Sequence, residues 1–489
     1  MSQLTLHELL PSIAWPEELA ALVVKQWRLD SRQVQPGDGF LGLVGCAQDG
    51  REYVPQAAAA GAVVALVEGQ RFALEEVQGL LCVAVPNLRA QLGGLLAAHY
   101  QSTTNQLPVV AITGTNGKTS VAGFVQQLAA KLGQPWGLLG TFGACFNGTC
   151  EDLGLTTADA ASVHRHWHAF RQQGAKGLVL EASSHALHQQ RLAGLPVEVA
   201  VWTNIGRDHL DYHGTVAAYV AAKTALLQRP ELQAAALSAD DQRLRDLAKA
   251  LSIPVYTFGQ HSSSDLRYAD VQYNATGVSF TLTYQGQHWP VALPLYGAFN
   301  VENALAAMAA LLPLGHRIET MLPHLASLQP VHGRMEQVQD AQGPTVVVDF
   351  AHTADALAAV LSALRAHFAG RIHCVFGCGG DRDAGKRPLM AQAAEQGADF
   401  VWLTSDNPRS ENPQNIIADM QQGLSTTAKV QVHVDREAAI AAAIAAAGAE
   451  DIVLIAGKGH EEEQIIGSQR HAFSDKAVAS KYLAIWRAA

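Results

Sequence analysis

The chain has 489 residues, more than one hydrophobic core normally serves, so roughly two to four domains are expected. Hydrophobic residues make up 48% of the chain and charged residues 16%, a composition that excludes an intrinsically disordered protein. The formal net charge of -10 argues against a nucleic-acid-binding protein, because the phosphates of nucleic acids require a basic surface.

The sequence gives no indication of export or of membrane insertion. The N-terminus, MSQLTLHELL, lacks the basic start and apolar block of a secretion signal, and the alanine-rich stretch 438–449 is too short to cross a bilayer. The six cysteines do not indicate a disulfide framework, and without a CxxC pair they do not indicate zinc. Cys374 and Cys378 are expected to be small apolar core residues. We therefore expect a cytoplasmic protein.

Residues 1 to about 100 predict a small α/β domain. Short apolar runs at 40–45, 62–68 and 80–85 have the length of buried strands. Turn signals such as Pro36-Gly37-Asp38 separate the predicted elements of this segment. We expect this first domain to end at residue 102.

From about residue 108 the pattern changes to strand, glycine loop and helix, which is typical of a parallel α/β domain. The apolar run 108–113 predicts a strand, and apolar residues at helical spacing predict a helix after the loop that stops at Gly133. Residues 278–295 alternate as a hairpin does, before a helix over 300–312. The histidine-rich run 164–168 is expected on a helix surface rather than at a metal site.

Beyond residue 331, four apolar strands each end in a polar or glycine-rich cluster, in the segments 346–352, 372–383, 400–409 and 451–461. Ligands of open parallel sheets bind beyond the carboxyl ends of the strands, so the four clusters are expected to face one crevice of a Rossmann-like domain. The predicted fold class is therefore α/β. Three domains are expected, at 1–102, 103–330 and 331–489, the central one a phosphate-loop mononucleotide-binding parallel sheet.

The segment GTNGKTS at 114–120 has the composition of a nucleotide-binding loop. Its glycines allow backbone amides to approach phosphates, Lys118 supplies a positive charge, and Thr119 is placed to bind magnesium. The first glycine of the usual GxxxxGK[ST] spacing is absent, because Ile112 occupies its position. A glycine turn without a ligand is the alternative. Phosphate loops also serve switches, kinases and motors, so the loop alone does not define a reaction.

Acidic and histidine residues follow the next predicted strands. Glu181 lies in EASSH, Asp208 and His209 lie in TNIGRDHLDYHG, and Lys223 lies on a predicted helix after them. Magnesium prefers hard oxygen ligands and tolerates few protein groups, so this set is suited to a second metal ion beside the phosphate loop. A solvated polar loop with ordinary helix-capping roles is the alternative.

Several segments occur in the order seen in the Mur ligase family, which the chain resembles over nearly its whole length. These segments are GTNGKTS, EASSHAL, TNIGRDHLDYHG, YGAFNVENALAA, HGRME and DFAHTADAL. The resemblance accounts for the shortened phosphate loop. It implies that ATP phosphorylates a substrate carboxylate and that an amino acid attacks the acyl phosphate, so the chain is expected to be an ATP-dependent amide-bond-forming ligase.

The resemblance also implies which residues form the ATP site. The implied catalytic residues are Lys118, Glu181, His209 and Lys223, and the implied Mg²⁺ ligands are Thr119, Glu181, His209 and a carbamylated Lys223. The implied ATP-binding residues are Gly114, Thr115, Asn116, Gly117, Lys118, Thr119, Ser120, Asn303, Arg334 and Asp349. In the family's D-Y-A-H-T-P segment, Phe350 and Ala354 here replace Tyr and Pro, which keeps the aromatic ring but changes the turn.

The segment 29–50 resembles the UDP-binding domain of one branch of the family, the UDP-N-acetylmuramoyl-tripeptide synthetases. The residues implied for the nucleotide and the muramoyl-peptide are Leu29, Ser31, Cys46, Ala47, Gln48, Leu155, Thr156, Thr157, Ser183, Gln189 and Arg191. Cys46 and Leu155 depart from polar residues found in relatives, so backbone contacts are expected at Cys46 and no side-chain role at Leu155. An edge strand and turn without chemical role is the alternative for segment 29–50.

Asp406-Asn407-Pro408-Arg409 is the segment that separates amino-acid substrates within the family. Members that add meso-diaminopimelate carry DNPR, and lysine-adding members carry a different sequence. Diaminopimelate has a second carboxylate, which a guanidinium such as that of Arg409 can bind with two parallel hydrogen bonds. The resemblance adds Arg382, Gly457 and Glu461, with Glu461 suited to the distal ammonium. A capped turn after a strand is the alternative.

We therefore expect a ligase that adds meso-2,6-diaminopimelate to UDP-N-acetylmuramoyl-L-alanyl-D-glutamate in peptidoglycan synthesis, a process that supports cell shape and division. The alternatives are a lysine-adding homologue, a folylpolyglutamate-synthase-like ligase, and a nucleotide-gated binding protein without catalysis. The expected partners are the small-molecule substrates and ATP with Mg²⁺, without nucleic acid or membrane insertion, and the protein is expected to be a monomer. Because two domains contribute to the ATP site, open and closed forms are expected.

Overall fold

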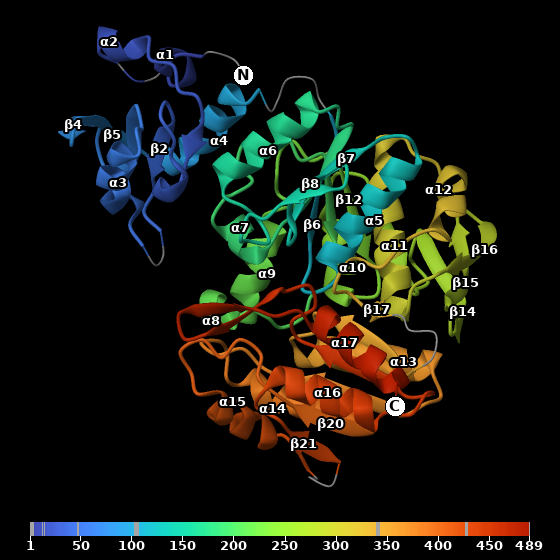
Figure 1. Cartoon of the computed structure of the whole chain (residues 1–489). Coiled ribbons are helices and arrows are strands. Elements are labelled where there is room, and N and C mark those ends of the chain that lie inside the picture. The colour runs from blue at the N-terminus through green and yellow to red at the C-terminus, as the bar shows by residue number, and fades with distance from the viewer. Residues whose placement is uncertain are drawn as a thin grey trace. The chain divides into compact units, whose positions relative to one another are not determined.

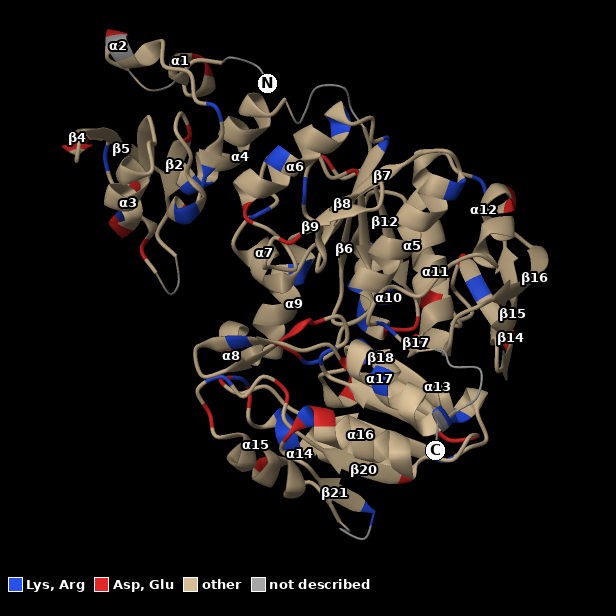
Figure 2. Cartoon of the chain, in the orientation of Figure 1, with Lys and Arg blue, Asp and Glu red and all other residues tan. Residues whose placement is uncertain are grey.

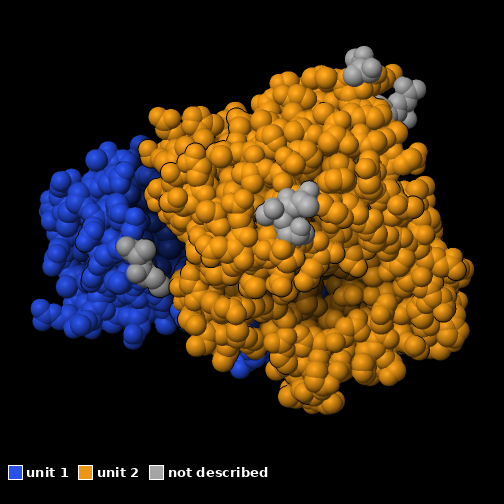
Figure 3. Space-filling view, turned by 90° about the horizontal axis from the view of Figure 1, so that it is seen from below, with its two compact units in different colours: residues 1–113, 129–201, 221–235 blue, residues 114–128, 202–220, 236–489 orange. Residues whose placement is uncertain are grey.

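The computed structural model describes residues 4–11, 13, 15–45, 48–101, 107–338, 343–425 and 429–488 (Figure 1). The chain forms two compact units, shown in different colours in Figure 3. Unit 1 contains residues 1–113, 129–201 and 221–235, and unit 2 contains residues 114–128, 202–220 and 236–489. The chain passes between the units within the elements α5 (Lys118–Lys131), β11 (Val199–Trp202), α9 (Val216–Thr224) and β12 (Ala234–Ser238).

The N-terminal part of unit 1 is a sheet with a core on each face. Its strand order is β1-β2-β3-β5-β4, and only the edge strand β4 is antiparallel to its neighbour. Leu66 and Val83 pack in the core that contains α4, whereas Ala65 and Val67 pack in the core that contains α3, as side-chain alternation in strands requires. The elements are α1 (Leu6–Leu9), α2 (Glu17–Ala20), β1 (Trp27–Arg28), β2 (Gly39–Gly42), α3 (Val54–Ala59), β3 (Val64–Gly69), β4 (Ala73–Val77), β5 (Leu80–Pro86) and α4 (Leu88–His99).

The rest of unit 1 contains parallel strands, and a hairpin follows at the end of them. Strand β10 (Gly177–Glu181) pairs in parallel with β6 (Val109–Thr113) on one side and with β7 (Trp136–Gly140) on the other. All three strands are buried along their length, as parallel strands covered on both faces are. The other elements are β8 (Gly143–Phe146), β9 (Thr149–Glu151), α6 (Ala160–Gln172) and α7 (Ser184–His188).

The first part of unit 2 contains the expected hairpin and the helix after it. Strands β15 (Gly277–Tyr284) and β16 (Gln287–Leu293) pair antiparallel, and α11 spans Ala298–Leu311. The other elements here are α8 (Leu210–His213), α10 (Gln242–Ala250), β13 (Val255–Gly259), β14 (Leu266–Asn274) and α12 (Ile318–Leu325). The sequence therefore predicted both elements to within a few residues.

The C-terminal part of unit 2 is a sheet covered by helices on both faces (Figure 1). Its strand order is β17-β18-β22-β19-β20-β21, and only the edge strand β17 is antiparallel. One core contains α13, α14 and α15, and the other contains α16 and α17. The elements are β17 (Glu336–Val338), β18 (Thr345–Asp349), α13 (Ala354–His367), β19 (Ile372–Phe376), α14 (Lys386–Gly397), β20 (Phe400–Leu403), α15 (Pro413–Gln421), β21 (Val430–Val432), α16 (Arg436–Ala446), β22 (Ile452–Ala456), β23 (Glu463–Ile466), β24 (Gln469–Ala472) and α17 (Asp475–Ala488).

This C-terminal sheet is Rossmann-like, as expected, because parallel strands alternate with helices on both faces. Cys374 and Cys378 are buried in its core, which is the expected apolar role. Within the described part of the chain, no helix has the length and apolar character that crossing a bilayer requires.

Candidate active site

The phosphate loop joins the end of β6 to the start of α5, as the sequence predicted. Its glycines lie in the left-handed region, with φ of 147° at Gly114 and 87° at Gly117. A Cβ on Gly114 would lie 1.9 Å from Oγ1 of Thr203, and one on Gly117 would lie 2.5 Å from Oδ1 of Asn303. Both positions therefore require glycine, for backbone conformation and for space.

The segment 203–206 fixes the middle of the loop. The amide of Thr115 donates to the carbonyl of Asn204 at 3.1 Å, and the amide of Asn116 donates to Oδ1 of Asn204 at 2.9 Å. Oγ1 of Thr115 accepts from the amide of Gly206 at 2.8 Å and lies 2.9 Å from the hydroxyl of Tyr219. These groups are occupied within the protein, so Thr115 and Asn116 shape the loop.

Two cations lie at the loop. Nζ of Lys118 donates to the carbonyl oxygens of Gly114 at 2.8 Å and Thr115 at 2.9 Å, which folds the ammonium over the loop. Nη2 of Arg334 donates to Oγ1 of Thr119 at 3.1 Å, although the two residues are 215 positions apart. The guanidinium of Arg334 lies 4.4 Å from the centre of the Phe350 ring, a cation–π distance. The aromatic side chain at position 350 therefore supports a cation at the phosphate loop.

Asp349 connects the end of β18 to the segment that carries Arg334. Its Oδ2 accepts from the amide of Met335 and its Oδ1 from the amide of Ala351, both at 2.7 Å. Burial raises the pKa of this carboxyl, which the charge of Arg334 opposes. The two backbone bonds orient the carboxylate, and each oxygen keeps a second lone pair for a ligand hydroxyl.

A carboxylate–histidine pair follows β11. Oδ2 of Asp208 lies 3.4 Å from Nε2 of His209. Burial lowers the pKa of His209, so the imidazole is neutral at pH 7, which is its metal-ligating form. Burial opposes ionisation of Asp208, but Coulombic attraction to His209 and His352, in their protonated forms, and to Lys118 lowers its pKa overall. This loop of the central segment thus shares its electrostatic environment with the phosphate loop and with His352.

Unit 1 contains the two other predicted metal ligands, Glu181 and Lys223. Glu181 ends β10 and is fully buried, and its Oε1 accepts from the amide of Thr141 at 2.8 Å. Nζ of Lys223 is also buried and lies 3.3 Å from Oγ1 of Thr113, the residue before the phosphate loop.

Some of the four predicted ligands carry the oxygen donors that magnesium prefers. The hydroxyl of Thr119 and the carboxylate of Glu181 are hard oxygen donors, and a carbamate on Lys223 would be another. Among the described residues, no group of three or more His, Cys, Asp and Glu side chains is arranged to hold a metal ion. In nucleotide sites magnesium uses few protein ligands and takes oxygens from phosphate and water, and oxygen donors of this kind fit that chemistry.

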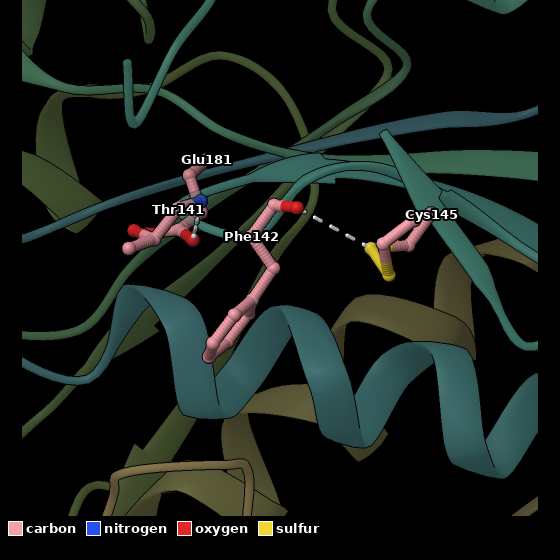
Figure 4. The surroundings of a disulfide bond; sticks show 5 residues. Thr141, Phe142, Cys145 and Glu181 are labelled. Atoms are coloured by element: carbon pink, nitrogen blue, oxygen red, sulfur yellow. Dashed lines mark hydrogen bonds between the residues drawn. A yellow bond between two sulfur atoms is a disulfide. The ribbon is translucent and has the colours of Figure 1, made fainter. Parts of the chain in front are cut away.

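A disulfide lies on the hairpin that follows Thr141, the residue that contacts Glu181 (Figure 4). Cys145 and Cys150 face each other on β8 and β9 and are bonded. The turn before β8 includes Thr141, whose amide holds the Glu181 carboxylate. The sequence indicated no disulfide framework, and it did not reveal this single bond, which forms because the hairpin brings two cysteines five positions apart into register.

Four of the residues predicted to bind the muramoyl-peptide form one hydrogen-bonded cluster after β10. Oγ1 of Thr157 donates to the carbonyl of Glu181 at 2.7 Å and accepts from the amide of Ser183 at 3.1 Å. Arg191 donates to the carbonyl of Thr157 at 2.6 Å and to Oε1 of Gln189 at 2.7 Å. Polar side chains therefore gather next to the catalytic carboxylate predicted at position 181.

The remaining residues of that set lie elsewhere in unit 1. Thr156 lies before the cluster and contacts Thr141, whereas the side chain of Leu155 is 49% exposed. Leu29 and Ser31 lie in the N-terminal part, where Oγ of Ser31 donates to Oε1 of Gln56 at 2.8 Å. The carbonyl of Gln48 accepts from the amide of Gly45, and the side chain of Gln48 is exposed. Cys46 and Ala47 lie outside the described residues.

The predicted amino-acid residues meet at the carboxyl edge of the C-terminal sheet. Nδ2 of Asn407 donates to Oε2 of Glu461 at 2.8 Å, which joins the loops after β20 and β22. Arg409 has φ of 50°, and its Nη1 donates to the carbonyl of Gly380 at 2.8 Å, which joins the loop after β19. Figure 2 shows both acidic and basic segments near α14, where these loops lie. Three of the four clusters that were expected to face one crevice, those after β19, β20 and β22, therefore meet at one edge of the sheet.

The other members of this set shape the same edge. Asp406 accepts from the amide of Asn407 at 2.6 Å, and a Cβ on Gly457 would lie 2.9 Å from Oδ2 of Asp406. The backbone of Gly380 bonds to Asn407, and a Cβ on Gly379 would lie 3.0 Å from Arg409 and 3.7 Å from Arg382. Burial lowers the pKa of Arg409 and the nearby charge of Arg382 adds to this effect. Two guanidiniums, those of Arg409 and Arg382, therefore lie near each other at this edge, and the carboxylates of Asp406, Glu461 and Asp381 oppose the lowering of the Arg409 pKa.

Comparison with known proteins assigns the family. The model of the Mur ligase family, catalytic domain, matches residues 24–100, the Mur ligase middle domain matches 112–311, and the Mur ligase, glutamate ligase domain, matches 333–459. A protein of Ectopseudomonas mendocina (strain ymp), named UDP-N-acetylmuramoyl-L-alanyl-D-glutamate--2,6-diaminopimelate ligase, is 41% identical over 486 residues, which is 99% of each chain. This chain belongs to the Mur ligase family.

Solved structures agree with this assignment. A structure of UDP-N-acetylmuramoyl-L-alanyl-D-glutamate--2,6-diaminopimelate ligase matches with a TM-score of 0.70 and 35% identity over 99% of both chains. A Mycobacterium tuberculosis folylpolyglutamate synthase in complex with ADP and AMPPCP matches at 20% identity, TM-score 0.61, over 76% of this chain and 92% of its own, and shares the fold. The predicted family, α/β fold class and class of ATP-dependent amide ligase are confirmed.

Two residues of this Mur ligase were missed in the sequence analysis. Lys458 is fully buried and donates to both Asn407 and Glu461. Arg436 is fully buried, pairs with Asp475 at 2.7 Å and donates to the carbonyl of Ala456 at the end of β22. The only sequence signal for Lys458 was its place in GKGHE directly after a strand. Arg436 lies on a helix far from the motifs and gave no signal.

The histidine run of the Mur ligase corrects another expectation. Residues 164–168 do lie on a helix, α6, but His164, His166 and His168 are buried rather than on its surface. His164 Nε2 lies 2.8 Å from the carbonyl of Ala193, and His168 Nδ1 lies 2.9 Å from that of Tyr100. Burial lowers the pKa of His164 to about 4. These imidazoles bond remote backbone carbonyls, which a helical pattern in the sequence does not reveal.

Proposed function

We propose that this Mur ligase uses ATP to join meso-2,6-diaminopimelate to UDP-N-acetylmuramoyl-L-alanyl-D-glutamate, in the cytoplasm and as a monomer, during peptidoglycan synthesis. The observation that carries the proposal is the meeting of Asn407, Arg409 and Glu461 at one sheet edge. A cation and an anion at that edge suit an amino acid whose distal end has both a carboxylate and an ammonium. The names of near-full-length relatives support the same two substrates.

In the first step, the terminal phosphoryl group of ATP passes to a carboxylate of the D-glutamyl residue and leaves ADP and an acyl phosphate. Lys118 and Arg334 would stabilise the charge on the transferred group, since both cations lie at the loop. Gly114, Gly117 and Ser120 would shape the backbone around the phosphates, and Asn303 and Asp349 would contact the nucleoside. Thr119, Glu181 and His209 would hold Mg²⁺, which when bound neutralises charge on the phosphate oxygens.

Lys223 is the fourth proposed metal ligand, as a carbamate. Carbon dioxide adds to a neutral lysine amine and turns a cation into an anion. The burial of Lys223 and the hydroxyl of Thr113 at 3.3 Å support this chemistry, because a carbamate oxygen could accept a hydrogen bond there.

Chemical rescue tests the carbamate. A Lys223→Ala enzyme should have little activity and should regain part of it when short-chain carboxylic acids are added, because their carboxylate replaces the carbamate. A Lys118→Met enzyme is the control, since a carboxylic acid should not restore a missing cation. Unmodified Lys223 by intact mass, in an enzyme that is fully active in buffer stripped of carbon dioxide, would contradict the proposal.

In the second step, the free amine of diaminopimelate attacks the acyl carbon, an amide C–N bond forms, and the C–O bond breaks to release phosphate. The amine loses its proton in the process. Arg409 and Arg382 would hold the distal carboxylate and Glu461 the distal ammonium, while Asp406, Pro408 and Gly457 would shape the turns around them. Holding the distal end fixes where the attacking nitrogen lies, which is how positioning accelerates such a step.

The nucleotide-sugar peptide would bind to unit 1. Leu29, Ser31, Cys46, Ala47 and Gln48 would contact the uridine diphosphate. The cluster of Thr157, Ser183, Gln189 and Arg191, with Leu155 and Thr156 beside it, would hold the muramoyl-peptide. The hydrogen bonds that join this cluster to the carbonyl of Glu181 support the placement of the acceptor carboxylate near that residue. We propose domain limits at 1–102, 103–330 and 331–489, which the separate family models support.

Phosphate release measures the proposed reaction directly. Release should require ATP, UDP-N-acetylmuramoyl-L-alanyl-D-glutamate and meso-diaminopimelate together, and the product should have the mass of the amide. Replacing diaminopimelate with L-lysine tests the lysine-adding alternative. Supplying a folate and glutamate as the two substrates tests the folylpolyglutamate-synthase-like alternative. ATP hydrolysis that does not depend on any amino acid would contradict the proposal.

A further inference from the structure

The buried lysine after β22 has no role in the proposed mechanism. Lys458 is 0% exposed and lies between Gly457 and Gly459, whose φ values are 112° and 54°. These two glycines let the chain turn so that the lysine side chain points into the protein beneath the amino-acid loops. A lysine is rarely buried without a partner, so the groups that it contacts indicate its purpose.

The ammonium of Lys458 has three acceptors. Nζ donates to Oε2 of Glu461 at 2.8 Å, to the backbone carbonyl of Glu463 at 2.7 Å and to Oδ1 of Asn407 at 3.1 Å. An ammonium has three protons, so its hydrogen-bonding capacity is filled by the protein. Lys458 is therefore a positioning residue and does not itself contact a substrate.

These bonds fix the side chains of Asn407 and Glu461. Oδ1 of Asn407 also accepts from the amide of Ile465 at 2.9 Å, and its Nδ2 donates to Oε2 of Glu461. Both bonds to the Glu461 carboxylate use Oε2, and no donor within the described chain bonds Oε1. Glu461 is partly exposed, with 32% of its side chain accessible. Because the two protein donors use Oε2, Oε1 keeps its lone pairs for a ligand ammonium.

The charge of Lys458 has a second effect, on the choice of amino acid. Diaminopimelate ends in an ammonium and a carboxylate, whereas lysine ends in an ammonium alone. A fixed positive charge repels both ammonium groups equally but attracts only the extra carboxylate. Near a protein surface, such an attraction over a few ångströms is large enough to change affinity by about an order of magnitude.

We propose that Lys458 is a specificity-determining residue of the amino-acid site. This inference rests on the proposed function. It fixes Asn407 and Glu461 through its three hydrogen bonds, and its charge favours a zwitterionic distal end over a purely cationic one. Arg409 would bind the distal carboxylate directly, and Lys458 would act on it through the electrostatic potential of the site.

Two substitutions test this proposal, one that removes a positive charge from the site and one that removes a negative charge. Lys458→Gln removes the positive charge but keeps a hydrogen-bond donor, and it should lower the ratio of kcat/KM for diaminopimelate to kcat/KM for L-lysine by about tenfold or more. Glu461→Gln removes the negative charge and should raise the same ratio, because the extra carboxylate is then repelled less. Glu461 is partly exposed, so its variant keeps the test valid if Lys458→Gln does not fold.

A matched control is available on the surface of the same part of unit 2. Lys481 pairs with Glu437 at 2.7 Å and is 58% exposed, so Lys481→Gln removes one solvent-exposed lysine charge outside the amino-acid loops and should leave the ratio unchanged. If both test variants lower the two kcat/KM values equally, so that the ratio stays within about twofold of the wild type, the role of Lys458 is structural only and the proposal is wrong.

The wild-type enzyme separates this inference from the proposed function. Phosphate release that depends on diaminopimelate establishes the function before any variant is compared, and the two variants then bear on the Lys458–Glu461 pair. A wild type that does not use diaminopimelate would overturn the proposed function and, with it, the specificity role.

Discussion

The phosphate loop and the amino-acid loops are built in different ways, although both belong to unit 2. Backbone groups dominate the phosphate loop, where two glycines adopt left-handed conformations and the amides of Thr115 and Asn116 are tied to Asn204. Side chains dominate the amino-acid loops, where Asn407, Lys458 and Glu461 bond one another. A phosphate is common to all nucleotides and needs only amides and charge, whereas choosing between similar amino acids requires particular side chains.

The largest expected effect is on the phosphate loop. Lys118→Met should reduce kcat by roughly 10²–10³-fold, because it removes a fixed charge from the transferred phosphoryl group. Lys131→Met, on the exposed end of the same helix, is the control and should have near wild-type kcat. Steady-state phosphate release measures both. A Lys118→Met enzyme within about tenfold of the wild type would show that this cation is not part of the chemistry.

Arg409→Lys tests the role of side chains in the amino-acid loops. It should raise KM for diaminopimelate about ten- to a hundredfold, since losing a bidentate charged contact costs about 1.5–3 kcal/mol. KM for ATP should stay constant. Arg365→Lys, at a surface pair with Asp399, is the matched control. If KM for diaminopimelate is the same in both variants, the guanidinium does not bind the substrate.

Two glycine substitutions separate space from backbone strain in the phosphate loop. Gly117→Ala should raise KM for ATP about tenfold, because its φ is 87° and the new Cβ would lie 2.5 Å from Asn303. Gly133→Ala has a similar φ of 76° but open space around it, so it should lower stability by about 1–2 kcal/mol and leave KM for ATP unchanged. Calorimetry and kinetics distinguish the two outcomes. Equal KM values would exclude a role for the close approach to Asn303.

The smallest expected effect concerns the ring at position 350. Phe350→Leu should raise KM for ATP roughly two- to fivefold, because it removes a cation–π contact of about 0.5–1 kcal/mol with Arg334. Phe350→Tyr keeps the ring and should restore the wild-type value. If Leu and Tyr give the same KM, the ring does not support Arg334 through its face.

Much of the fold could be predicted from the sequence because hydrophobic periodicity is a local property. The strand before GTNGKTS, the helix after it and the four strand-and-cluster segments of the C-terminal sheet occur within a few residues of the expected bounds. The family could be recognised for a related reason, since its motifs are short runs of adjacent residues. The Mur ligase assignment then confirmed the predicted family, fold class and reaction class.

The features that the sequence did not reveal came from contacts that the tertiary structure makes, between residues far apart in the chain or across a hairpin. Two of the buried histidines of α6, His164 and His168, lie at hydrogen-bond distance from the carbonyls of Ala193 and Tyr100. The cysteines at 145 and 150 pair because a hairpin places them in register. Polar and sulfur-containing residues can be buried or exposed in a fold, and the partners that they find determine which.

The sequence by itself therefore determined which segments carry the chemistry, since glycine loops and charged strand ends are visible in a short window. The tertiary structure decided how these segments are held: Arg334 contacts Thr119 across 215 positions, and Lys458 joins the loops after β20 and β22. Such contacts depend on the packing of whole strands and helices. A motif names the residues of a site, and only the fold decides which hydrogen bonds their side chains make.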